Sequence, residues 1–155
     1  PLIPVFISYI LSFIYIGIYW NNHHHMMHAV RSINGGILWA NLFLLFWLSL
    51  VPFVTGWMGE NHFARWPVAL YGIILLMNAL AYSLLANKLI RHEGKNSALA
   101  AAVGNGAKGK ISVAFYLLAI LLSFLNAWLS FALYTLVAAI WFIPDKRIEK
   151  KLAGE

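Results

Sequence analysis

Four histidines and two asparagines are concentrated in eight residues of this chain, Asn21-Asn22-His23-His24-His25-Met26-Met27-His28. Imidazole nitrogens bind zinc, nickel and copper, and residues four apart lie on one face of a helix, so His24 and His28 could bind a metal ion. His25 and His28, three residues apart, could do so on the adjacent face. The chain has no cysteine to add a thiolate ligand. A metal site at His24 and His28 is therefore one interpretation of this cluster.

Other chemistry finds less support. A b-type haem would need a second histidine within the same membrane, and only His62 and His92 remain, both at loops or helix ends. The sequence contains no paired carboxylates, Ser-His-Asp set or phosphate-binding loop, so we expect neither an enzyme nor a cofactor. The simplest alternative is an interfacial belt, in which Tyr19, Trp20 and the histidines lie at the level of the lipid headgroups.

The composition indicates an integral membrane protein. Of 155 residues, 62% are hydrophobic and 10% are charged, whereas soluble domains have about 25% charged residues. In a lipid bilayer the backbone must satisfy its own hydrogen bonds, so we expect an all-α, polytopic transmembrane helix bundle. Lys and Arg outnumber Asp and Glu 11 to 5, but they lie in loops and the tail, which indicates topology and not a nucleic-acid partner.

The hydropathy pattern predicts one transmembrane domain over residues 1–155, with five visible helices. Pro52 should bend the second helix near its last turn, and the Ala-rich residues 98–103 favour a short surface helix. Residues 111–143 carry no charge, and Asn126 near their middle favours a hairpin of two helices, with one tilted helix as the alternative. The expected helices cover residues 2–30, 37–57, 67–92, 111–126 and 128–143, followed by a basic cytoplasmic tail at 144–155.

The positive charges give a direction to these helices. With alternating sides, ten of the eleven Lys and Arg residues fall on one face of the membrane and only Arg65 falls on the other. This asymmetry predicts a cytoplasmic C-terminus. The same alternation places Pro1 outside, so we expect one additional helix upstream and six helices per subunit.

Three residues near the end of the first helix and one in the second are expected to form an interhelical network. Unpaired amides and imidazoles that face lipid cost roughly 2 to 4 kcal/mol each, so they should turn toward protein. Asn41 lies one turn into the next helix and can face them. Hydrogen bonds of this kind contribute about 0.6 to 2 kcal/mol each. The expected members are Trp20, Asn22, His23 and Asn41.

Three stretches together resemble the bacterial branch of the transmembrane protein 175 family of potassium channels. They are Ile18-Tyr19-Trp20-x-Asn22-His23-His24, Leu38-Trp39-x-Asn41-Leu42 and Val51-Pro52-Phe53-x-Thr55. The resemblance covers about the first 90 residues, including Ala69-Leu70-Tyr71-Gly72. Beyond Glu93 it consists only of hydropathy and spacing.

The resemblance implies that each subunit has six helices and that four subunits surround a potassium pathway. In that family the first helix lines the pore and carries a Phe-Ser-Asp signature, which this sequence lacks; this agrees with the additional upstream helix. By similarity, Trp20, Asn22, His23 and Asn41 would receive that signature and anchor the pore helix.

The resulting prediction is a subunit of a homotetrameric channel that conducts K⁺ passively across the bacterial plasma membrane, with K⁺ as the permeant ion and no cofactor. Two alternatives stay open. One is a small metal- or proton-coupled transporter that uses the cluster from His23 to His28. The other is a non-transporting helix-bundle subunit of a larger membrane complex.

Overall fold

The structure, a computed structural model, describes residues 2–104 and 106–142. These residues form helices and, within those two ranges, no strand, which confirms the all-α prediction. The basic tail expected at 144–155 lies outside the described residues. The helices are α1 (Leu2–His28), α2 (Gly35–Ser49), α3 (Val51–Glu60), α4 (Arg65–Glu93), α5 (Ala98–Val103), α6 (Ala107–Leu122) and α7 (Ala127–Phe142).

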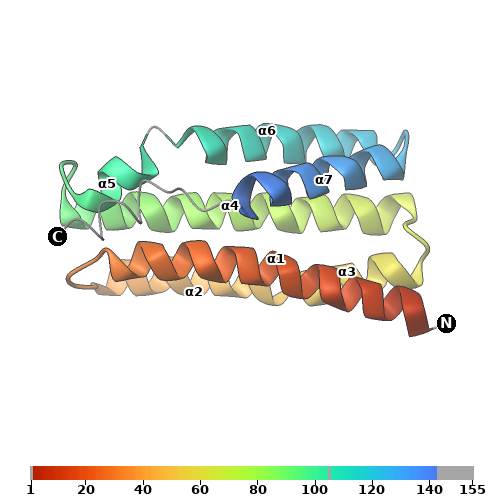
Figure 1. The fold of residues 1–155 in the computed structure, drawn as a ribbon, viewed down its shortest axis with the longest axis horizontal. Helices are drawn as coiled ribbons and strands as arrows, with labels where there is room; N and C mark the ends of the chain where they lie inside the picture. The colour runs from red at the N-terminus through yellow and green to blue at the C-terminus, as the bar shows by residue number, and fades with distance from the viewer. Residues whose placement is uncertain (1, 105, 143–155) are drawn as a thin grey trace.

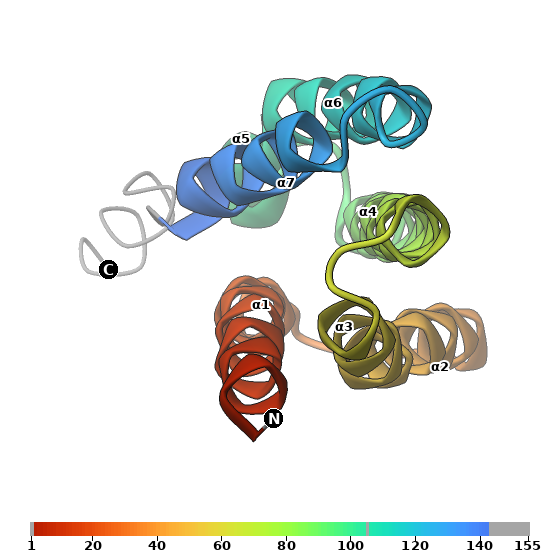
Figure 2. The same cartoon turned by 90° about the vertical axis from the view of Figure 1, so that its right-hand side faces the viewer.

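The long helices lie side by side along one axis, with α4 in the middle (Figure 1). The end-on view in Figure 2 shows α1, α2 and α3 on one side of the bundle and α6 and α7 on the other. The principal contacts of α4 are with α2, α3 and α6, while α1 packs on α3 and α6 packs on α7. The central helix therefore joins two groups of helices that are far apart in sequence.

The segment expected as one helix over 37–57 is two helices. The first ends at Ser49, and the backbone N–H of Leu50 donates to the carbonyl of Trp47 over 3.2 Å. Pro52 lies in the first turn of α3, where its missing N–H sacrifices no hydrogen bond, but it cannot continue the hydrogen-bond ladder of α2. The proline therefore interrupts this segment near its middle and does not merely bend its last turn.

Two stretches of the described chain are long and apolar enough to cross a membrane: Gly35–Glu60, which contains α2 and α3, and Arg65–Glu93, which is α4. Residues 107–142 supply two shorter helices, α6 and α7, joined as a hairpin. The turn between them ends at Asn126, whose side-chain oxygen accepts a hydrogen bond from the backbone N–H of Trp128 over 2.9 Å.

Two buried clusters hold the bundle. The first is rich in tyrosine: Tyr71 of α4 contacts Tyr15 of α1 and Tyr134 of α7 edge to face, with ring centroids 5.9 and 5.3 Å away. The Tyr15 hydroxyl donates to the carbonyl of Tyr134. The second cluster is aliphatic and lies toward the other end of α4, where Leu85 and Met26 are buried. Through these clusters α1 packs on α3, and its side chains also reach α2 and α4.

Candidate functional site

His23 of α1 and Asn41 of α2 are joined by a hydrogen bond of 2.6 Å between Nε2 and Oδ1. The two helices are antiparallel and joined by a short loop, and the two residues stand five and six positions from the helix ends at that loop. They therefore meet at the same level. Because the amide oxygen can only accept, the His23 Nε2–H is the donor, and both side chains are half-buried.

This bond leaves two polar groups without a partner. Neither Nδ1 of His23 nor Nδ2 of Asn41 makes a hydrogen bond within residues 2–104 and 106–142. In the neutral ring Nδ1 of His23 is an acceptor, and Nδ2 of Asn41 is a donor. The pair can therefore bind a further polar side chain without breaking its own bond.

Asn22 faces a different side of α1. Its Nδ2 donates to the carbonyls of Ile18, over 2.8 Å, and Trp141, over 3.5 Å. The backbone carbonyl of Asn22 accepts from the Tyr82 hydroxyl over 3.4 Å. Successive helical residues point about 100° apart, so Asn22 turns to α4 and α7 while His23 turns to α2.

Trp20 lies on an exposed face, with 62% of its surface accessible. Its ring stacks on His24, with centroids 5.2 Å apart and planes 15° apart. Of the four residues expected to form one network, the structure brings His23 and Asn41 together. Trp20 and Asn22 lie on two other faces of α1.

His24 and His28 do lie on one face, as their spacing indicates. Their ring centroids are 5.8 Å apart and the rings are nearly perpendicular, at 88°. Within the described part of the chain, no group of three or more His, Cys, Asp or Glu residues is placed to hold a metal ion. A closed zinc site takes four ligands, so this pair alone does not make one.

Sequence reasoning did not find the contact that fixes the loop between α1 and α2. In this loop Asn34 caps α2, since its Oδ1 accepts from the N–H of Ile37 over 3.0 Å. Its Nδ2 lies 3.3 Å from Nδ1 of His92, and the Ser32 hydroxyl lies 2.9 Å from the other ring nitrogen of His92. An asparagine before a Gly-Gly pair is an N-cap signal, but no local signal points to His92. The contact ties the loop to the end of α4 and so supports the pairing of α1 with α2.

The fold and the composition together define a class, the polytopic α-helical membrane proteins. The particular family follows from similarity to known proteins. The family described as endosomal/lysosomal potassium channel TMEM175 matches residues 1–52, the part of the chain that contains the His23 and Asn41 pair.

Relatives extend the match over the rest of the chain. A potassium channel of Chryseobacterium sp. (strain P1-3) is 57% identical over 152 residues, which cover 98% of this chain and 79% of the relative. A potassium channel of Chamaesiphon minutus is 30% identical, over 90% of this chain and 71% of the relative. A potassium channel of Streptomyces collinus is 29% identical over 53% of this chain and 42% of the relative. No solved structure matches. The chain belongs to the TMEM175 family of potassium channels, which confirms the resemblance seen in its sequence.

Proposed function

We propose that this chain is a subunit of a channel that conducts K⁺ passively across the bacterial plasma membrane as a homotetramer, with a cytoplasmic C-terminus. Family membership supports the channel class. One structural observation carries the mechanism, the 2.6 Å hydrogen bond between His23 and Asn41.

The proposed role of this pair is to anchor a pore-lining helix. The bond fixes the rotation of α1 relative to α2, because both side chains must face each other at the same level. The unpaired Nδ1 and Nδ2 atoms are costly next to lipid, where unsatisfied polar groups lose several kcal/mol. A polar side chain of the pore-lining helix, such as a carboxylate, would satisfy the Nδ2 donor and hold that helix in register.

The other two residues act from neighbouring faces in this proposal. Asn22 fastens α1 to α7 through the carbonyl of Trp141, so α1 is held from two sides. Trp20 presents an exposed aromatic surface, which is suited to packing against the pore-lining helix. With α1 fixed in this way, an apolar constriction on the pore-lining helix could control conduction by excluding water.

Ion flux from proteoliposomes tests the function directly. The chain, expressed from its complete natural reading frame, should pass K⁺ faster than Na⁺ in the absence of any coupled gradient. His23→Ala should reduce this flux more than His25→Ala, because only His23 reaches Asn41. Equal K⁺ and Na⁺ flux, or transport that requires a metal or proton gradient, would refute the channel function. A greater loss in His25→Ala would refute the anchoring role.

A further inference from the structure

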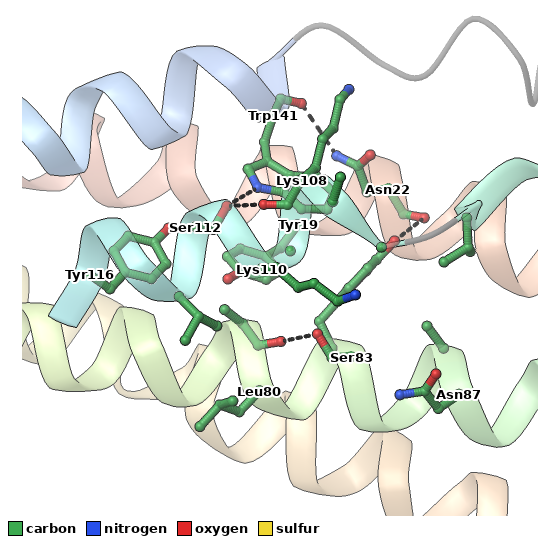
Figure 3. A pocket seen from close by; sticks show the side chains of 18 of the residues that line it. Tyr19, Asn22, Leu80, Ser83, Asn87, Lys108, Lys110, Ser112, Tyr116 and Trp141 are labelled. Carbon is green, nitrogen blue, oxygen red and sulfur yellow. Dashed lines mark hydrogen bonds between the residues drawn. The ribbon is translucent and has the colours of Figure 1, made fainter.

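A cavity of about 910 Å³ lies between α1, α4, α6 and α7 (Figure 3). Its volume is within the roughly 300 to 1,000 Å³ typical of small-molecule sites. Asn22 lines it, whereas His23 turns to α2. The cavity is thus separate from the proposed anchoring pair, and the proposed function gives it no role.

The lining changes in polarity along the length of the cavity. On α4 it extends from Ala79 to Ile90, a rise of about 16 Å. The inner end, toward the tyrosine-rich cluster, is aromatic and aliphatic, and its lining includes Tyr116 and Val113 of α6 and Tyr15 of α1. The outer end is formed by Asn87 and by the loop before α6. A ligand that fits this order is apolar at one end and polar at the other.

Two lysines in the first turn of α6 give the cavity a positive charge. Lys110 is exposed, and within the described ranges it makes no hydrogen bond or ion pair. It extends between α6 and α4 in Figure 3. The Nζ of Lys108 lies over the ring of Trp141, 6.0 Å from its centroid. Because the described lining includes no Asp or Glu to pair with Lys110, the charge of Lys110 favours an anionic ligand.

The placement of charges along α4 indicates that the lysines lie close to the boundary of the hydrocarbon core. A Cβ on Gly109 would be 3.6 Å from the Ser83 hydroxyl, so the first turn of α6 is level with Ser83 of α4. After Arg65, the next charge along α4 is Lys88, five residues beyond Ser83, or about 8 Å. A lysine side chain can extend over that distance to the interface. This is the depth at which the phosphates of membrane lipids lie.

We propose that this cavity binds an anionic phospholipid from the leaflet that faces the basic loops. The phosphate interacts with Lys108 and Lys110, and part of one acyl chain occupies the end lined by Val113 and Tyr116. A free phosphate ion would also interact with the lysines, but it would leave the apolar end of the cavity unfilled. The proposal needs only that the chain is in a membrane and does not depend on whether it conducts potassium.

Lipid retention tests the charged end. The full chain is reconstituted in phosphatidylcholine vesicles with a minor fraction of phosphatidylglycerol and extracted in mild detergent, and the bound lipid is counted by native mass spectrometry. The wild type should retain phosphatidylglycerol in preference to phosphatidylcholine. Lys110→Gln should weaken this binding roughly 5-fold and Lys108→Gln/Lys110→Gln roughly 30-fold. The matched control, Lys88→Gln/Lys95→Gln, removes the same charge away from the cavity and should retain the lipid as the wild type does.

A second arm tests the apolar end and separates a lipid from a free phosphate. Ala138→Phe fills the inner cavity with both lysines intact and should lower phosphatidylglycerol retention; Leu80→Trp does the same if the first variant does not fold. Inorganic phosphate in the extraction buffer should not displace the lipid. The proposal is overturned if phosphatidylcholine is retained equally, if the control double variant loses as much lipid as Lys108→Gln/Lys110→Gln, or if phosphate displaces the lipid while the filled cavity still retains it.

Discussion

The hydroxyl of Tyr134 occupies the space that a side chain at residue 72 would need. A Cβ added to Gly72 would overlap this oxygen and would also stand 2.7 Å from Cγ1 of Ile120. The same hydroxyl donates to the carbonyl of Val68 over 3.1 Å, so it is held in place. The absence of a side chain on Gly72 thus allows α7 and α6 to pack directly on α4.

Gly72→Ala should therefore destabilise the bundle. Adding atoms to a packed core costs about 1 to 3 kcal/mol, and the midpoint of thermal unfolding in detergent should fall. Gly17→Ala is the matched control, since no atom lies within 4 Å of a Cβ added there, and it should leave the midpoint unchanged or raise it. Combining Gly72→Ala with Tyr134→Phe should restore part of the loss, because the nearest overlapping atom is then gone. Equal midpoints for the two glycine variants would contradict this account.

The bond between His23 and Asn41 should appear as a coupling energy. In a double-mutant cycle with alanine at both positions, we expect about 0.6 to 2 kcal/mol of coupling in unfolding free energy, the range for interhelical hydrogen bonds in membranes. The parallel cycle of Asn22 with Asn41 should give none, since Asn22 bonds to Trp141 and Ile18 instead. Coupling of the same size in both cycles would mean that the four residues act as one network.

Asn34 should matter more than its position in a loop suggests. Asn34→Ala removes both the cap on α2 and the contact with His92, and the loss of an N-cap alone costs about 0.5 to 2 kcal/mol. Ser32→Ala, which removes one exposed contact with the same ring, should cost less. Unfolding midpoints of the two variants provide the measurement, and a larger loss for Ser32→Ala would contradict the ranking.

The pair of His24 and His28 distinguishes the transporter alternative from the channel. We expect His24→Ala/His28→Ala to leave K⁺ flux unchanged, because neither ring reaches Asn41 and both are exposed. Zinc titration of the flux supplies the measurement. A zinc effect on transport that is present in the wild type and lost in the double variant would support a metal-coupled transporter.

The sequence was sufficient to predict the helical class and one element of the candidate site. Hydropathy indicated the helices because the charges lie in loops or close to the helix ends. The meeting of His23 with Asn41 was predictable because a short loop between antiparallel helices brings equidistant residues to one level. The break at Leu50 was less predictable, since a proline can bend a helix or end it, and the choice depends on packing against neighbours.

The rotation of α1 could not be predicted from its sequence. Apolar residues surround this helix, including Phe13 and Ile14, which are exposed, and Tyr15, which is buried. Without a polar stripe to mark the outside, the sequence does not say which face packs on which neighbour. For this reason Asn22 and His23, which are adjacent in sequence, were expected to face the same neighbouring helix. In the structure Asn22 faces α7 and His23 faces α2. The cavity beside Asn22 also escaped prediction, because it depends on where α6 begins relative to α4.

The unequal lengths of the helices have a consequence for the surrounding bilayer. At 16 residues, α6 is about 24 Å long, whereas α4 has 29 residues and reaches about 43 Å. A hydrocarbon core of roughly 30 Å is thicker than the length of α6 and thinner than the length of α4. Lipids next to α6 must therefore compress while α4 tilts or protrudes, and we expect the protein to favour thinner membranes over thicker ones.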